Sequence, residues 1–381
     1  MSGLQYPDGC CRGFPVEQNQ LINGPNSFAA AGSMATGIPA PSLVPIPENG
    51  ILVADGALLT QEFTSVFLEP RHLGQMHAWN VAYQRTLPGA FTAEVAYVGN
   101  RTSNPWNSTN INAGLVVGAD RAGQVLFNQF GRTGTTTAVV QDERPDRKYH
   151  SMQVKVDRRM RGGLAMTNSY TLARGWDYLD NYPAAPDRFE RGYGRSAFDN
   201  CCPTHSYTSS FVYMLPLGPE GKWLREGVAS KILGDWQVTG LFSASSGIPI
   251  SFTASASGLR APGNSQTPNV TETPKVLGGI GANALWFDTS VFSAPAAGTW
   301  GNVKRYDLLN GPAYVNLDAS IVKILRFGPR RAEIRADFFN ALNQAHYANP
   351  NGTLGNANFG RITDILPLTE RMVRFGVRFL F

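Results

Sequence analysis

The chain has 381 residues and a formal net charge of +5, yet only 16% of its residues are charged, against about 25% in typical soluble proteins. Its basic residues are scattered and form no block or stripe, which argues against a nucleic-acid partner. No run of about 18 apolar residues is present, so the sequence contains no candidate membrane helix. The 40 glycines and the dispersed apolar residues indicate a chain that is neither disordered nor rich in helices.

Residues 1–70 are expected to form a loop-rich segment, followed by a strand-rich domain from 71 to 381. The opening "MSGLQYPDGCCRGFPVEQNQ" has no basic stretch followed by an apolar run, so we do not expect a signal peptide there. Its two cysteines, Cys10 and Cys11, have a second adjacent pair in Cys201 and Cys202. Zinc ligands are usually spaced by two to four residues. Loop cysteines that bridge between the pairs in an oxidising compartment, or stay reduced, are therefore favoured over a metal site.

Alternation of apolar and polar residues starts near residue 79 and continues to the end of the chain. In "SMQVKVDRRM" (151–160), Met152, Val154 and Val156 share one face and polar residues share the other. A period of two is typical of β-strands. Similar segments are 79–87, 91–99, 164–174, 205–215, 236–245, 315–327 and 331–342. The uncharged stretch 236–259 is expected to hold two strands around a turn.

The connections between these segments fall into two classes. Three-residue turns join 79–87 to 91–99, 151–160 to 164–174 and 315–327 to 331–342, whereas 173–206 and 256–310 are long polar stretches. We predict roughly ten to twelve strands of about 8 to 12 residues, the length that crosses a bilayer when tilted. Short turns at one end and long loops at the other are typical of an antiparallel transmembrane β-barrel. A soluble β-sandwich or propeller is the alternative, because half-buried strands alternate as well.

A barrel in lipid directs apolar residues outward and polar residues into the lumen. Aromatic residues gather at the two membrane interfaces. The predicted girdle residues are Trp79, Tyr83, Tyr97, Tyr170, Tyr213 and Trp236. The alternating charges Arg331, Glu333, Arg335 and Asp337 are predicted to form cross-strand pairs in the lumen.

The final strand, "VRFGVRFLF", places Val373, Phe375, Val377, Phe379 and Phe381 on one face, although chain termini usually fray. Catalytic motifs such as HExxH, a P-loop or GxSxG are absent, so an enzyme is not expected, and no cofactor is predicted. The five histidines, His72, His77, His150, His205 and His346, are dispersed, which favours surface or lumen positions over a shared metal site.

Several segments together resemble a known family: "WNVAYQRTLPGAFTAEVAYVGNRTSN", "LGDWQVTGLFSASSGIPISF", "RAEIRADFFNALNQAHY" and the terminal "RFGVRFLF". From about residue 70 to the end, the sequence is similar to the C-terminal barrel of Oar-like TonB-dependent receptors of the bacterial outer membrane. The resemblance implies an outer-membrane protein of a Gram-negative-type bacterium that takes up an unidentified ligand. It also implies lipid of the outer membrane and the TonB system as partners.

Complete receptors of this family have 22 strands, an N-terminal plug and a TonB box. The present sequence has about half that number of strands and neither of the other parts, so the resemblance implies a C-terminal portion in which residues 1–70 belong to an extracellular loop. Phe375, Phe379 and Phe381 resemble the signal that the barrel-assembly machinery recognises. The competing interpretation from another class is a secreted or surface-attached sandwich or propeller that binds polysaccharide or protein.

Overall fold

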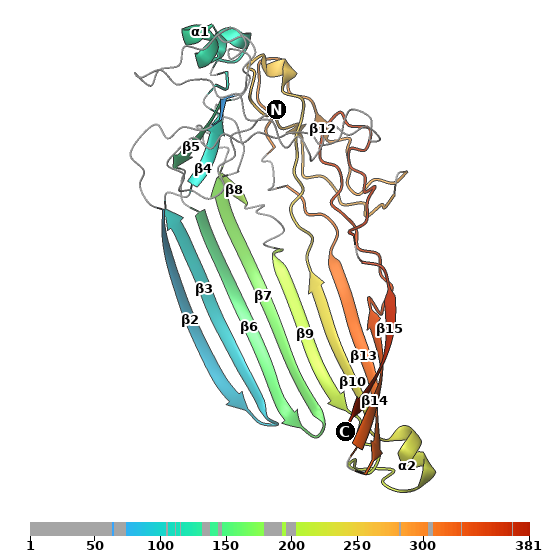
Figure 1. Cartoon of the computed structure of the whole chain (residues 1–381). Coiled ribbons are helices and arrows are strands. Elements are labelled where there is room, and N and C mark those ends of the chain that lie inside the picture. Colours follow the sequence, from blue (N-terminus) through green and yellow to red (C-terminus); the bar gives the residue numbers. More distant parts are fainter. Residues whose placement is uncertain are drawn as a thin grey trace, which may run out of the picture.

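The computed structural model describes residues 63–64, 74–103, 106–110, 112–114, 116–131, 138–143, 147–178, 193–195, 203–281, 283–303, 308–328, 330–367 and 369–381. These residues form one large sheet with long loops gathered at one of its ends (Figure 1). The segment predicted for residues 1–70, apart from Phe63 and Thr64, and all four cysteines lie outside the described residues. No helix in the described ranges is long and apolar enough to cross a membrane.

The main sheet is antiparallel and has ten strands. Nine of them follow one another in the order β15-β14-β13-β10-β9-β7-β6-β3-β2, which is the order of the chain in reverse, and the short β8 pairs with β7. Their bounds are β2 (Gln75–Leu87), β3 (Phe91–Ser103), β6 (Arg147–Arg161), β7 (Leu164–Tyr178), β8 (Tyr193–Arg195), β9 (His205–Met214), β10 (Trp236–Ser245), β13 (Tyr314–Phe327), β14 (Arg330–Phe339) and β15 (Met372–Leu380). Within the described residues, β2 and β15 are the two edges and the sheet is not closed.

The remaining elements are short and lie outside this sheet. A small sheet joins β1 (Phe63–Thr64), β5 (Ala138–Glu143) and β4 (Trp106–Asn110), and a second pairs β11 (Asn269–Val270) with β12 (Phe292–Ser293). The helical segments are η2 (Asp120–Gly123), α1 (Val125–Phe130), α2 (Gly227–Leu233) and η5 (Ser257–Leu259). The expectation of two strands within 236–259 is wrong, because only Trp236–Ser245 forms a strand.

Tight turns connect the strands at one end of the sheet, here called the turn end. Between β6 and β7, Gly162 and Gly163 both have positive φ, of 61° and 81°. Two positive φ values define the hairpin turn that matches the twist of the flanking strands, and glycine adopts them without steric cost. A Cβ on Gly163 would also lie 2.5 Å from the carbonyl oxygen of Met214. The opposite end of the sheet is called the loop end.

The strand register sorts the side chains into two contrasting faces. Val81 is paired with Tyr97, Tyr97 with Met152, and Met152 with Leu172, so this row of large apolar residues shares one face across four strands. The same face, called the apolar face, carries Val373, Phe375, Val377 and Phe379 of β15. Val81 and Phe375 are 70% and 78% exposed, so in the described part of the protein this face lacks a covering layer. The opposite face, called the polar face, carries Thr92, Glu94, Gln153, Lys155, Thr167, Ser169, Thr239, Asp318 and Asp337.

The hydrophobic core of the protein lies in the loops. The described residues within 112–131, 246–313 and 340–367 meet at the loop end to form a unit called the loop head (Figure 1). Its core contains Ile250, Phe252, Phe287, Phe292 and Val303, against which Phe359 packs. Rings of the four phenylalanines lie 5.2 to 5.6 Å apart. Residues more than a hundred positions apart in the sequence thus bury one another, which gives these long loops a fixed structure.

Backbone hydrogen bonds fasten the three loops of the head to one another. The amides of Gly114 and Gly118 donate to the carbonyls of Pro262 and Leu259, at 2.8 and 2.9 Å. Between the other two loops, the amide of Trp286 donates to the carbonyl of Gly360 at 2.7 Å. The loop head is therefore built jointly, and each of the three loops depends on its neighbours for backbone partners.

Candidate functional site: the polar face and the loop head

The polar face carries a cluster of charges on β14 and β15. Asp337, 7% exposed at its side chain, accepts hydrogen bonds from Arg335 and from Arg374, the latter at 3.1 Å. Arg374 is the register partner of Asp337 on the neighbouring strand. Because the carboxylate is buried and the two guanidinium groups are half exposed, the cluster presents net positive charge to the space above the polar face.

The four charges predicted from the sequence lie together on the polar face, but the pairs among them run along β14, and within the described residues only Asp337 has a cross-strand partner, Arg374. Arg331 and Glu333 form an ion pair at 3.5 Å, and both share this face with Arg335 and Asp337. A depression of about 200 Å³ adjoins the cluster and is lined by Thr239, Leu241, Asp318, Ser320, Arg335 and Asp337. On β6, Lys155 lies 2.9 Å from Asp157, and the Thr167 hydroxyl donates to Asp157 at 2.7 Å. The polar face thus offers paired charges and hydroxyls to anything that lies against it.

All six aromatic residues predicted for the girdle lie on the apolar face. Tyr213 and Trp236 are at the turn end of their strands. Trp79, Tyr97 and Tyr170 lie further inside their strands than the sequence suggested. The reason is that β2, β3 and β7 each continue four residues closer to the loop end, starting at 75 against 79 and ending at 103 against 99 and 178 against 174.

Two histidines for which the sequence favoured surface or lumen positions lie on the apolar face as partners of tyrosines. A hydrogen bond of 2.6 Å joins Tyr97 Oη and His150 Nδ1, and one of 2.7 Å joins Tyr170 Oη and His205 Nδ1. Trp79 lies beside His150, with ring centroids 6.3 Å apart. The pairs could have been found only through the strand register, because their members are 53 and 35 residues apart in the sequence.

The last strand places its aromatic residues as the alternation predicted. Phe375 and Phe379 lie on the apolar face of β15, opposite Ala336 and Ala332 of β14. Phe381 follows the strand and is 98% exposed. The carboxyl terminus lies at the turn end of the sheet (Figure 1).

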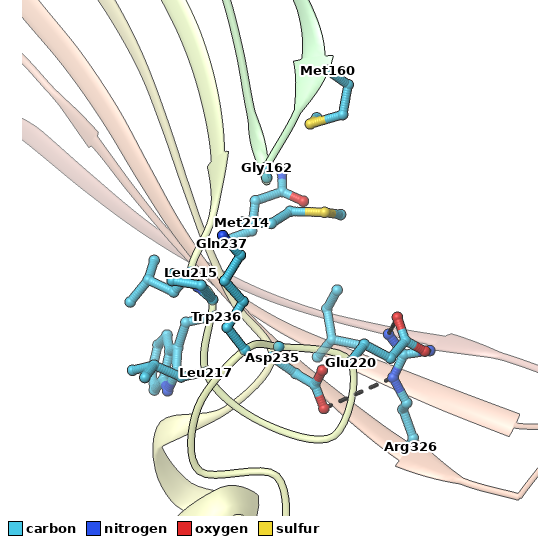
Figure 2. A pocket seen from close by; sticks show the side chains of 15 residues that line it. Met160, Gly162, Met214, Leu215, Leu217, Glu220, Asp235, Trp236, Gln237 and Arg326 are labelled. Carbon is cyan, nitrogen blue, oxygen red and sulfur yellow. Dashed lines mark hydrogen bonds and ion pairs between the residues drawn. The ribbon is translucent and has the colours of Figure 1, made fainter. Parts of the chain in front are cut away.

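A cavity of about 340 Å³ at the turn end was not predicted from the sequence (Figure 2). Its walls include Met160, Met214, Trp236, Gln237 and Ile324, and its rim holds an ion-pair group. Arg326 lies 3.1 Å from the carboxylate of Glu220 and 3.8 Å from that of Asp235. The connection between β9 and β10 is therefore held against the turn-end residues of β13.

Two carboxyl groups of the loop head are held ionised by their neighbours. The hydrogen bond from Arg260 lowers the pKa of the Asp120 carboxyl and ties residues 112–131 to residues 246–313. At Asp288, hydrogen bonds from the hydroxyl and the amide of Ser290 lower the carboxyl pKa. The part of the chain that the structure describes contains no group of three or more histidine, cysteine, aspartate or glutamate side chains able to hold a metal ion.

One antiparallel sheet with an exposed apolar face, a polar face, tight turns at one end and long loops at the other defines the wall of a transmembrane β-barrel. The comparison with protein families agrees. Residues 7–374 match the family model described as "Outer membrane beta barrel domain", and the chain belongs to this family. It is accordingly a protein of the outer membrane, and lipid covers its apolar face. The soluble sandwich or propeller is not supported, because the ten strands form one sheet.

Solved structures that resemble the chain are transporters and receptors of low sequence identity. The FrpB iron transporter from Neisseria meningitidis (F5-1 variant) is 10% identical, with a TM-score of 0.40 over 82% of this chain and 32% of that one. The ferripyoverdine receptor of the outer membrane of Pseudomonas aeruginosa is 10% identical, with a TM-score of 0.38 over 80% and 26%. The ferric citrate transporter FecA is 12% identical, with a TM-score of 0.37 over 80% and 31%. The chain thus spans about a third of the length of these structures, and no protein of curated function matches it significantly.

Proposed function

We propose that the chain forms part of the barrel wall of a TonB-dependent receptor of the Oar-like kind, which takes up a ligand across the outer membrane. The main support for the proposal is that the loop head is a packed unit with its own hydrophobic core at the loop end of a membrane-spanning sheet. A wall with no other task needs only short connections at both ends, whereas a receptor needs a defined surface outside the membrane. The sequence resemblance to Oar-like receptors supports the same assignment.

In such a receptor the polar face lines the lumen and lies against the plug. The charge cluster of Asp337, Arg335 and Arg374 offers guanidinium groups to plug carboxylates or backbone carbonyls. The edges of β2 and β15 are paired by further strands of the barrel, because unpaired backbone groups in lipid cost several kcal/mol each. The role is binding and transport, not catalysis, and no cofactor is invoked.

Three further assignments belong to this proposal. Tyr213 and Trp236, at the turn end of their strands, mark the periplasmic membrane interface. Trp79, Tyr83, Tyr97 and Tyr170 face lipid further inside their strands. Phe375, Phe379 and Phe381 present the signal read by the barrel-assembly machinery. Residues 1–70 belong to an extracellular loop. A disulfide from Cys10 or Cys11 of that loop to Cys201 or Cys202 is compatible with the oxidising environment outside the cytoplasm.

Uptake assays in matched strains test the proposal. Cells with and without the protein, each with and without TonB, are given a panel of ferric siderophores, cobalamin and oligosaccharides, and the loss of each compound from the medium is measured. We expect that uptake of at least one compound requires both the protein and TonB. Uptake that is the same in all four strains for every compound would count against a transport role.

Peptide mapping by mass spectrometry gives a second, independent test. The protein is purified from the outer membrane, and peptides are assigned to the polypeptide that contains the barrel strands. We expect sequence of a plug and a TonB box on that polypeptide. A purified polypeptide that lacks both would contradict TonB-driven uptake by this protein while leaving its place in the outer membrane intact.

A further inference from the structure

The connection between β9 and β10, residues 215–235, is called the turn-end segment, and it straddles the end of the sheet. Its first half reaches the polar face, where Glu220 pairs with Arg326, a polar-face residue of β13. Its second half contains α2 and reaches the opposite face. There the indole Nε1 of Trp236 donates to the carbonyl of Ile232 at 2.9 Å. The segment therefore has one part on each side of the wall.

Strand register places the contacts of α2 on the apolar face. Trp236 is paired with Lys323, and the next residues on the same face are Val238 and Ile321. Lys323 in turn is paired with Ile334 of β14. The helix thus lies on the side of the sheet that faces lipid.

Lys323 is the group that fixes α2 in this position. Its ammonium donates to the carbonyls of Lys231 at 2.7 Å and Ile232 at 3.2 Å, and also to that of Gly234. The side chain is buried although it stands on the apolar face. A lysine on a lipid-facing strand is costly unless its charge is solvated. The carbonyls at the C-terminal end of α2 supply that solvation.

Two glycines hold the halves of the turn-end segment in contact. A Cβ on Gly218 would lie 2.6 Å from the Cα of Gly234, and one on Gly234 would lie 2.4 Å from the carbonyl oxygen of Ser230. Both backbones therefore cross at a distance that only glycine permits. This contact joins the part of the segment that precedes α2 to the residue that follows it.

The outer surface of the turn-end segment is apolar. Val228 and Ile232, four residues apart on one side of α2, are 73% and 60% exposed, and Trp223 just before the helix is 62% exposed. Leu224 and Leu233 add to the same exposed set. Three basic residues, Lys222, Arg225 and Lys231, and one acidic residue, Glu226, are exposed among them. Apolar side chains with interspersed basic groups are the pattern of a segment that lies in a membrane interface.

We propose that the turn-end segment is an interfacial anchor whose helix α2 inserts into the phospholipid leaflet on the periplasmic side of the outer membrane. Val228, Ile232 and Trp223 enter the boundary between headgroups and acyl chains, and the neighbouring basic side chains meet lipid phosphates. Lipid is the partner that fits this surface, because α2 is hydrogen-bonded to Trp236 and Lys323 and so adjoins the face of the sheet that lipid already covers. The anchor depends on the outer-membrane location alone and not on transport.

Fluorescence quenching in lipid tests the anchor. Four variants carry a single labelled cysteine, V228C, I232C, E220C or V377C, in the full chain with its four native cysteines replaced by serine. Each is labelled with an environment-sensitive dye and placed in vesicles of phosphatidylethanolamine and phosphatidylglycerol. V377C calibrates lipid contact, since Val377 is 62% exposed on the apolar face. E220C is the matched control on the same segment, because Glu220 lies on the polar side.

We expect the dye at Val228 and Ile232 to be quenched by spin-labelled lipid as it is at Val377. Quenching by aqueous iodide should be at least about threefold weaker at these two sites than at Glu220. Iodide quenching at Val228 and Ile232 equal to that at Glu220 would overturn the proposal, because α2 would then lie in water. Protection from iodide without quenching by spin-labelled lipid would overturn it as well and would indicate contact with a second copy of the chain.

Discussion

The core of the loop head provides a sharp test, because its stability should be separable from that of the sheet. Phe287 is fully buried, and its ring lies 5.5 to 5.6 Å from the rings of Phe252, Phe292 and Phe359. Replacing a buried phenylalanine by alanine costs about 3–5 kcal/mol. Since all three ring neighbours belong to the head, we expect Phe287→Ala to destabilise the head by about 4 kcal/mol and to leave the strand ladder intact.

Hydrogen exchange measured by mass spectrometry resolves the two units. A loss of about 4 kcal/mol corresponds to an opening equilibrium about 10³ times more favourable. Peptides from residues 246–303 and 346–366 should therefore exchange faster by up to that factor, while peptides from β6 and β13 keep their wild-type rates. Phe327→Ala is the matched control, because the same change is made at a residue that is 61% exposed at the turn end. Unchanged exchange in the loop head, or equal acceleration in the head and in the strands, would refute the prediction that the head can be destabilised without the sheet.

Three further predictions concern charged groups. Asp337→Asn should reduce the free energy of unfolding by about 1 kcal/mol, because two half-exposed arginines lose an ionic partner. In detergent gels the folded band should therefore be lost at a lower temperature than in the wild type. Glu333→Gln is the control, since the ion pair of Glu333 is longer and more exposed. Lys323→Met should cost about 2 kcal/mol and expose residues 222–233 to protease at the turn end, and an unchanged cleavage rate would contradict the role of its three carbonyl contacts. The Asp120 carboxyl has a lowered pKa in the folded protein, so its contribution is present above the unfolded pKa of about 4 and is lost as pH falls through the lower folded value. Faster exchange of residues 112–131 in Asp120→Asn, relative to wild type, should therefore be seen at neutral pH and disappear in strong acid.

The sheet could be predicted from the sequence because its pattern has one physical cause. A side chain on a strand faces either lipid or the polar side, so the period of two reports the register directly. All eight alternating segments correspond to strands of the main sheet. The ends of the strands were predicted less accurately. Strands β2, β3 and β7 each continue four residues further toward the loop end, where the alternation fades.

The loop head could not be predicted in the same way. Ile248, Ile250 and Phe252 alternate as a strand would, yet Ile250 and Phe252 are buried against Phe287 and Phe292 in the head and not exposed on a lipid-facing strand. The pattern is identical for both outcomes, since a period of two records only that alternate residues are buried or apolar. Whether the segment becomes a membrane strand or part of the loop head depends on packing partners about 40 and 100 residues further along the chain. Single-sequence patterns carry no information about such contacts.

Exceptions to the alternation are the signal that could have located the turn-end segment. Lys323 occupies an apolar-face position between Ile321 and Leu325, and Arg158 occupies another at the turn end of β6. Both side chains donate to backbone carbonyls: Lys323 to those of α2, and Arg158 to that of Leu164 at 3.1 Å and of Gly89 at 3.4 Å. A cation on a lipid-facing strand must find acceptors locally, because lipid tails offer none. A basic residue that breaks the apolar alternation near a turn therefore predicts backbone acceptors close by, which the connection 215–235 supplies for Lys323 and the tight turns supply for Arg158.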